Sequence, residues 1–245
     1  MSAKREYWSC SIKLSSSVLK SEVMRRVSLA SQLKPYRGIG ELWRMASQYT
    51  VLRKWEQKYQ FKSACEVPYQ DYVWGVDGHA LDCYHRSYRR FSDMETKFDL
   101  VWNFCVIQQN PRMIYQMIRN SNEYVASFVP NSLNIGRTLH GFYHFVHKTQ
   151  CTHPDRGDRS LMTLSGLIQL FKHAGIRIFE AGYCDMPPQP DWVISLKNFF
   201  KPADLETPYR PSTTVQMLER VFWFDQANPL PKRIWAHHPY VFGGI

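Results

Sequence analysis

The sequence predicts a mixed α/β protein whose open, mostly parallel sheet carries helices on both faces. From residue 61 onward, short apolar runs alternate with stretches of helical periodicity, which is the pattern of strand–helix–strand units. Residues 98–107 form the longest of these runs and are predominantly apolar, as expected of a strand buried on both faces. A hydrophobic fraction of 44% and an aromatic fraction of 15% exclude a disordered chain.

Two parts of the chain differ in character. Residues 1–60 hold a basic, Ser-rich leader (1–34) and an amphipathic helix (40–59), in which apolar residues recur at steps of three and four. Residues 61–245 form the α/β domain, with strands expected at 63–67, 72–76, 98–107, 123–129, 176–183 and 235–242. Helices are expected at 78–91, 111–119 and 161–173, and Gly175 ends the last of them. Residues 186–211 are Pro-rich and are expected to form a loop.

Charge and cysteine usage indicate which partners and which cellular compartment suit the protein. The net charge of +10 favours anionic partners such as nucleic acid, acidic lipid or an acidic protein. The six cysteines are scattered without a CxxC pair, which is typical of reduced thiols. The composition of residues 1–34 is compatible with a mitochondrial targeting segment or with a plain basic tail. No apolar run reaches the roughly 18–20 residues needed to cross a bilayer, so no transmembrane segment is predicted.

Several segments of the second half carry a family resemblance. The run Phe98-Asp99-Leu100-Val101, the pair Asn110-Pro111 and the segments 123–131, 160–175 and 176–188 resemble strands and helices of the class I S-adenosylmethionine-dependent methyltransferases. The resemblance implies a Rossmann-like sheet, with residues 235–242 as its closing strand and the methyl donor over its first half. It covers residues 98–188 well, the C-terminal strand fairly and the first third poorly.

The donor-binding half departs from the family pattern. Glu66 stands where the first strand ends in an acidic residue, but Pro, Tyr and Gln replace the glycines that let the backbone bend toward the donor. If the donor site survives, the resemblance assigns it to Glu66, Gly75, Asp77 and Asn103. Too few residues separate Glu66 from Asp99 for three strand–helix–strand crossovers of roughly 30 residues each. We therefore expect a sheet truncated at this edge, with the first strand covered by the 40–59 helix, the N-terminal arm or a partner.

Other clusters of polar residues receive structural interpretations. The densest group of metal-capable side chains is His140, His144, His147, Cys151 and His153, but it matches no known zinc spacing, and no metal site is predicted. Asp155 and Asp158 are interpreted as part of a solvated loop. His237 and His238 are interpreted as satisfied histidines of the closing strand.

The sequence thus predicts a methyltransferase-like protein without catalytic activity or cofactor. It would serve as a structural or accessory subunit of a large mitochondrial assembly, such as a respiratory-chain complex, an ATP synthase or a mitoribosome. Its partners would be other protein subunits and, in one reading, RNA. The alternative is an active S-adenosylmethionine-dependent methyltransferase that acts on RNA, protein or a small molecule, and the alternative location is the cytoplasm.

Overall fold

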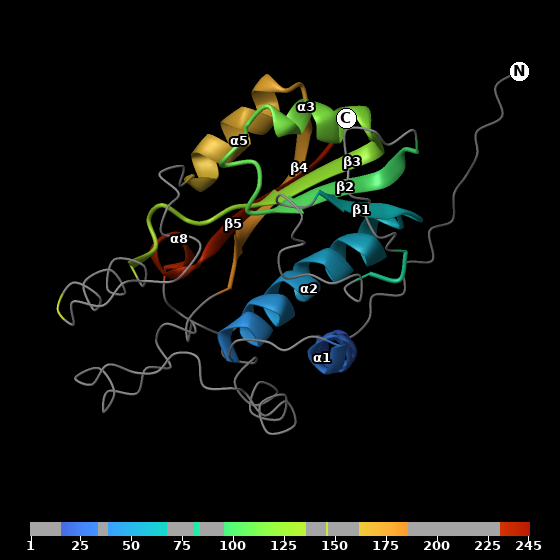
Figure 1. Ribbon diagram of the computed structural model, residues 1–245, viewed down its shortest axis with the longest axis vertical. Coiled ribbons are helices and arrows are strands. Elements are labelled where there is room, and N and C mark those ends of the chain that lie inside the picture. The colour runs from blue at the N-terminus through green and yellow to red at the C-terminus, as the bar shows by residue number, and fades with distance from the viewer. Residues whose placement is uncertain are drawn as a thin grey trace, which may run out of the picture.

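The centre of the protein is a five-stranded sheet in the order β1-β2-β3-β5-β4 (Figure 1). The computed structural model describes residues 16–33, 39–67, 81–83, 96–135, 146, 162–185 and 231–245. Its strands are β1 (Ala64–Val67), β2 (Phe98–Phe104), β3 (Ser121–Phe128), β4 (Arg177–Cys184) and β5 (His238–Gly244). β1, β2 and β3 pair in parallel, whereas β5 runs antiparallel to both β3 and β4. The predicted α/β class with a mostly parallel sheet is confirmed.

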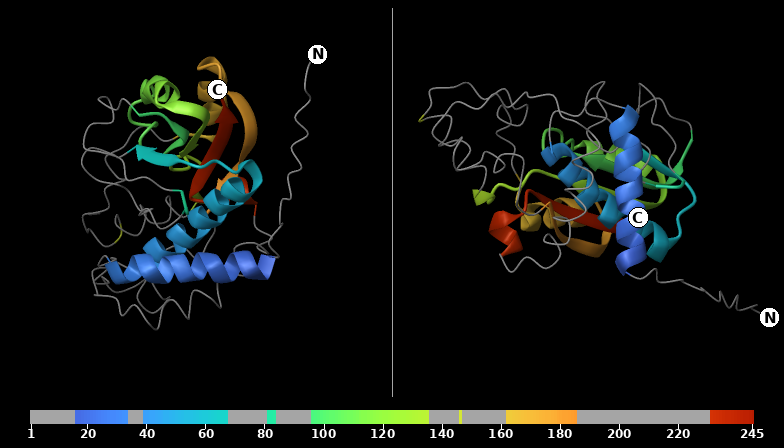
Figure 2. Two further views of the ribbon diagram at one scale, coloured as in Figure 1. Left: turned by 90° about the vertical axis from the view of Figure 1, so that its right-hand side faces the viewer. Right: turned by 90° about the horizontal axis from the view of Figure 1, so that it is seen from below.

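Helices cover both faces of this sheet (Figures 1 and 2). α1 (Ser16–Leu33) and α2 (Ile39–Tyr59) lie on one face, and α3 (Met113–Arg119) and α5 (Leu164–His173) lie on the other. On the α1–α2 face, aromatic rings fill the core, with the centroid of Trp55 4.7 Å from Phe242 and that of Tyr59 4.6 Å from the same ring. The opposite core is mainly aliphatic, with Val101, Val125 and Leu167 fully buried. A short helix, α8 (Lys232–Trp235), precedes β5.

The first helix was not predicted from the sequence. Leu19, Val23 and Val27 follow one another at four-residue steps, which places them on one side of α1. They are 8%, 0% and 0% exposed and belong to the core that α2 and the sheet share. Ser is the most frequent residue of this stretch, and the Ser and charged residues between the apolar positions hide a narrow apolar stripe. Residues 16–33 of the predicted leader are therefore part of the folded core.

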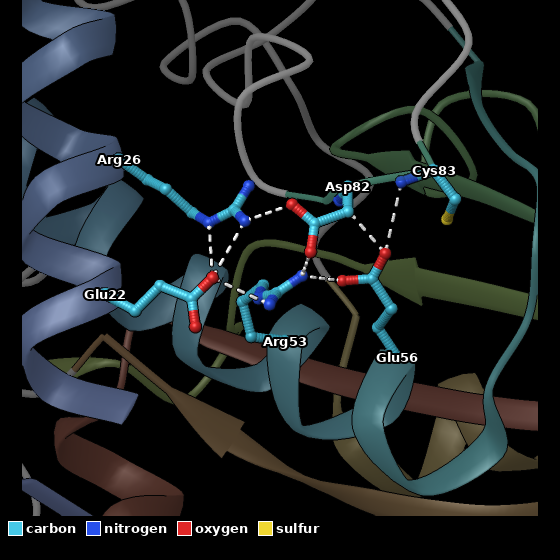
Figure 3. A network of polar contacts seen from close by, with 6 residues as sticks. All are labelled: Glu22, Arg26, Arg53, Glu56, Asp82 and Cys83. Atoms are coloured by element: carbon cyan, nitrogen blue, oxygen red, sulfur yellow. Dashed lines mark hydrogen bonds and ion pairs between the residues drawn. The ribbon is translucent and has the colours of Figure 1, made fainter. Parts of the chain in front are cut away.

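A partly buried polar network ties α1 and α2 to residues 81–83 at the edge of the sheet (Figure 3). Its members are Glu22 and Arg26 of α1, Arg53 and Glu56 of α2, and Asp82 and Cys83. Arg53 donates to Glu22 at 2.7 Å and to Asp82 at 2.9 Å, and it also pairs with Glu56. Arg26 pairs with Glu22 at 2.8 Å and with Asp82. Because both arginines are only 6% exposed, these carboxylates compensate guanidinium charges that the protein has largely removed from water.

The same network corrects one predicted helix. Residues 81–83 lie within the helix expected at 78–91, but they form a turn, because Glu56 Oε1 accepts hydrogen bonds from the backbone amides of Asp82 and Cys83 at 3.0 and 3.2 Å. The Cys83 carbonyl in turn accepts a hydrogen bond from the Ala64 amide at 3.2 Å. This turn therefore occupies part of the free edge of β1, where the sequence analysis expected a cover.

Most element boundaries fall within three residues of the expected ones. The closing strand differs in the structure of its first predicted residue. Trp235, expected to start the strand, is the last residue of α8, and the strand begins at His238. The strand expected at 72–76 and the loop expected at 186–211 lie outside the described residues. None of the helices described here combines the length and the apolar character that a membrane span requires.

Candidate functional site

The carboxyl ends of β1, β2, β3 and β4 meet at one edge of the sheet, and β5 begins at that edge because it runs the other way. In open α/β sheets this is the edge where ligands bind, since the loops that follow parallel strands converge there. The topology thus gathers Glu66, Cys105, Asp185 and His238 from four separate stretches of sequence. We call this region the carboxyl edge.

Strained backbone conformations mark two positions of the carboxyl edge. Cys105 follows β2 with φ of 56°, and Asp185 follows β4 with φ of 65°. L-residues other than glycine seldom adopt this left-handed region, although Asp tolerates it better than Cys. Such residues cluster at functional sites, where the surrounding structure holds them in place. Both strained residues are buried, at 5% and 0% exposure.

Asp185 lies against two consecutive histidines. Asp185 Oδ2 is 3.4 Å from Nδ1 of His237 and 3.2 Å from Nδ1 of His238. Asp185 is 0% exposed and His238 is 3% exposed, whereas the side chain of His237 is 22% exposed. The backbone amide of His237 donates to the Asp185 carbonyl at 2.9 Å, which fixes the two segments side by side. We call these three residues the Asp–His–His cluster.

The protein interior shifts the ionisation of this cluster. Burial lowers the pKa of His238 to about 4, despite the neighbouring Asp185 carboxyl. Burial alone would raise the pKa of Asp185, but the two imidazole rings beside Oδ2 outweigh it and hold that pKa well below its ordinary value. At neutral pH His238 is therefore a neutral imidazole next to an ionised carboxylate.

An aromatic ring and a cation complete the surroundings. The Phe104 ring lies 4.8 Å from the His238 ring, measured between centroids. The guanidinium of Arg44, from α2, lies over the same Phe104 ring, with Cζ 5.3 Å from the ring centroid. Phe104 of β2 thus packs against His238, and His237 is the most exposed member of the cluster.

Two asparagines hold the segment that leads into the histidines. Asn131 Nδ2 donates to the carbonyls of Arg233 and Ala236 at 2.9 and 2.8 Å. Asn134 Nδ2 donates to the carbonyls of Trp235 and Ala236 at 2.9 and 3.0 Å. Both asparagines are 2% exposed. The loop after β3 therefore sets the position of the backbone just before His237.

The two predicted donor residues that the structure describes lie on opposite faces of the sheet. Glu66 pairs in register with Trp102, whose side chain faces α1 and α2, and Glu66 is 1% exposed. Asn103 is one residue further along β2 and faces α3, where its amide donates to Met117 Sδ at 3.1 Å. Its Oδ1 accepts a hydrogen bond from Ser127 Oγ at 3.0 Å. The structure thus separates Glu66 from Asn103.

Other predicted site residues lie outside the described residues. These are Gly75 and Asp77 of the donor site, the metal-capable group of residues 140–153, and Asp155 and Asp158. The assignment of the donor site to Glu66, Gly75, Asp77 and Asn103 stays a prediction.

The fold follows from the strand arrangement. The resemblance placed the strand ending near Glu66 beside the strand beginning at Phe98, with the C-terminal strand closing the sheet. β1 does pair with β2, and β5 is inserted antiparallel between β3 and β4. The strand arrangement agrees with the mostly parallel, Rossmann-like sheet that the resemblance implies.

No protein-family model matches the chain, and no curated protein matches its sequence. Among solved structures it is similar to the plantazolicin methyltransferase BpumL in complex with a triazolic desmethylPZN analogue and SAH, at 10% identity and a TM-score of 0.43 over 92% of this chain and 98% of that one. It is also similar to the methyltransferase domain of bacterial CtHen1, at 6% identity and a TM-score of 0.40 over 81% of this chain and 97% of that one. A third is the magnesium protoporphyrin IX methyltransferase of Synechocystis with bound SAH, at 10% identity and a TM-score of 0.35 over 93% and 82%. No residue role is transferred from these proteins.

The sequence analysis missed the Asp–His–His cluster. Asp185 directly follows β4, and His238 begins β5, whereas the sequence analysis placed both histidines inside the closing strand expected at 235–242. The position of Asp185 was the available signal, because polar residues after strand ends gather at the carboxyl edge. The antiparallel insertion of β5, which brings the two ends together, is what the local pattern does not contain.

Proposed function

We propose that this protein is a methyltransferase-like subunit of a larger, mitochondrial assembly and that it does not transfer methyl groups. The placement of Asn103 carries the proposal. The resemblance would turn this residue toward the methyl donor, yet its side chain is fully buried and engages Ser127 and Met117 on the face away from Glu66. Rebuilding a donor contact there would break both hydrogen bonds.

Local sequence and charge support the same proposal. The stretch after Glu66 has Pro, Tyr and Gln in place of the glycines that a donor loop needs. The net charge of +10 suits acidic protein subunits or RNA as neighbours within the assembly. The fold would then be retained for the surfaces it presents.

Titration of S-adenosylmethionine and S-adenosylhomocysteine into the purified full-length protein tests the absence of donor binding. Isothermal calorimetry is expected to give no heat of binding up to millimolar ligand, with near-UV circular dichroism as the check that the protein is folded. Micromolar binding that Glu66→Gln or Asp77→Asn abolishes would overturn the proposal and establish a donor site. Lys172→Ala, an exposed change on α5, is the control for unspecific effects on the measured heat.

Sedimentation of the native protein tests the role as a subunit. In an extract of mitochondria from cells that express it, the protein is expected to sediment far faster than a 29.0 kDa monomer. Treatment with ribonuclease separates the two kinds of partner, because a particle built on RNA would dissociate and a protein complex would not. A monomeric position in the gradient without treatment, or absence from mitochondria, would contradict the proposal.

A further inference from the structure

We propose that Asp185, His237 and His238 form a binding site for a divalent transition metal of the zinc class. The three side chains come from two segments that the fold brings together at the carboxyl edge. Each offers one ligand atom, and the three atoms lie within 4.8 Å of one another. This inference goes beyond the proposed function and does not depend on it.

Two of the three separations between the ligand atoms fit an ion held between them. Zinc binds imidazole nitrogens and carboxylate oxygens at about 2.0–2.2 Å, so two ligands of a tetrahedral site lie about 3.4 Å apart. The separations from Asp185 Oδ2 to the Nδ1 atoms of His237 and His238 are 3.4 and 3.2 Å. Both distances therefore match the edge of a zinc tetrahedron.

The alternative to a metal is direct hydrogen bonding, for which both Nδ1 atoms are close enough to Asp185 Oδ2 at 3.4 and 3.2 Å, but the contacts do not have hydrogen-bond geometry. Neither carboxylate oxygen of Asp185 accepts a hydrogen bond from the described part of the chain, and Nδ1 of His238 makes none there either. A buried carboxylate without hydrogen bonds is strongly destabilising unless a cation compensates it. An ion between the carboxylate and the two ring nitrogens would satisfy both oxygens of Asp185 and Nδ1 of His238 together.

Local backbone geometry turns the three side chains toward one point. The left-handed conformation of Asp185 directs the chain away from the β4 direction immediately after Cys184. His237 lies in the bend before β5, so its ring and that of the next residue stay close, with centroids 5.3 Å apart. In a regular strand, consecutive side chains would point to opposite faces. The bend thus keeps both histidine rings on the same side of the chain, where a regular strand would separate them.

The ligand set indicates the class of metal. Two imidazoles and one carboxylate suit zinc and other borderline transition metals, whereas magnesium and calcium prefer oxygen ligands alone. Three protein ligands leave one coordination position for water or another ligand, as in catalytic zinc sites. His237 is the partly exposed member, so that position would be on the solvent side of the cluster.

Zinc titration of the full-length, chelator-treated protein tests the site. The variants are Asp185→Asn, which keeps the side-chain shape and tolerates the left-handed backbone, and His237→Ala, which changes the most exposed ligand. The matched control is His173→Ala, an exposed histidine at the end of α5. Because other histidines and cysteines of the chain can also bind zinc, the readout is the difference from the wild-type protein in tight-binding equivalents and in affinity.

The wild-type protein is expected to bind one equivalent of zinc more tightly than either site variant, with at least a 100-fold loss of affinity at that equivalent, since even residues around a metal ligand change affinity 10–100-fold. His173→Ala should behave as wild type. With cobalt as a probe, the wild-type-minus-variant spectrum should show visible d–d bands without a thiolate charge-transfer band.

Wild-type stoichiometry and affinity in both site variants would overturn the proposal, as would a thiolate band in the difference spectrum or no zinc binding tighter than 100 µM in the wild-type protein. If Asp185→Asn proves unfolded by near-UV circular dichroism, His237→Ala decides the outcome.

Discussion

Replacement of Glu180 by alanine should detach one end of α2 from the sheet. Glu180 lies on β4, and its carboxylate accepts hydrogen bonds from three α2 side chains. Oε2 accepts from Trp55 Nε1 at 3.0 Å, and Oε1 accepts from Tyr59 Oη at 3.0 Å and from Lys58 Nζ at 2.6 Å.

The expected loss of stability is about 3 kcal/mol. Trp55 is 1% exposed, so its indole N–H would remain buried without an acceptor, which costs about 1–3 kcal/mol. The Tyr59 hydroxyl, which is half-buried, adds about 1 kcal/mol. Lys58 is 61% exposed, and surface pairs of this kind contribute little. The Trp55 bond therefore dominates.

Urea denaturation followed by circular dichroism measures this loss. With a urea dependence of about 3 kcal/mol per molar, the midpoint should fall by about 1 M. In a Trp55→Phe background the same Glu180→Ala change should cost about 1–2 kcal/mol less, because the donor is already gone. Lys54→Ala, an exposed change on the same helix, is the control. Equal costs of Glu180→Ala in both backgrounds would refute the reasoning.

The same carboxylate makes stability depend on pH. Burial alone would raise the pKa of Glu180, but the hydrogen bonds from Lys58, Trp55 and Tyr59 outweigh it and lower that pKa below the value of 4.5 in the unfolded chain. A lowered pKa stabilises the folded state above the unfolded value, and this stabilisation is lost as the pH falls through the folded value. The stability gap between wild type and Glu180→Gln should therefore be constant near pH 7 and shrink below about pH 4.5. A gap that widens on acidification would contradict this.

Four further experiments probe other parts of the structure. Gly243→Ala should cost about 2–3 kcal/mol in urea denaturation, because its Cβ would lie 2.5 Å from Ile176 Cγ2 and 2.7 Å from the Arg177 carbonyl oxygen. Gly175→Ala should cost only about 1–2 kcal/mol, since its φ is +83° but nothing lies within 4 Å; a larger loss than at Gly243 would contradict the packing argument. Asn131→Ala should cost about 2–3 kcal/mol and weaken zinc binding 10–100-fold, because the backbone before the histidines loses its hydrogen bonds; unchanged zinc affinity would separate the asparagine from the site. Burial, with the Glu66 charge, raises the pKa of Cys65 to about 12, so iodoacetamide should modify it at pH 8 only after unfolding, as mass spectrometry of the labelled peptide would detect.

Periodic apolar patterns predicted the elements of the sheet well. β2 is mainly apolar, and the second half of β3 is buried. α5 combines a clear apolar face with Thr163 as its N-cap, whose Oγ1 accepts a hydrogen bond from the Gly166 amide at 3.1 Å. Such signals are local, so one sequence contains them. α1 was not predicted because Ser and charged residues stand between its buried apolar residues, which are Leu19, Val23, Met24 and Val27.

The site was less predictable because it depends on pairing between distant strands. Alternation along β2 separates Trp102 from Asn103, but only the register with β1 decides that Glu66 shares the face of Trp102. Likewise, Asp185 and His238 are brought together by the register of β4 with β5, in which Cys184 stands opposite His238. A resemblance assigns residues to strands and leaves this register open.

The position of β5 also bears on how the protein reaches its native state. β5 is the last strand in the sequence, yet it lies inside the sheet and is the only described strand that touches β4. During synthesis, the edges of β3 and β4 that β5 will join stay unpaired until residues 238–244 have left the ribosome. Pairing over such sequence distances is slow, and unpaired strand edges promote aggregation in the meantime. We therefore expect the nascent chain to be most prone to aggregation before β5 pairs with β3 and β4, which is the period in which chaperones would protect it.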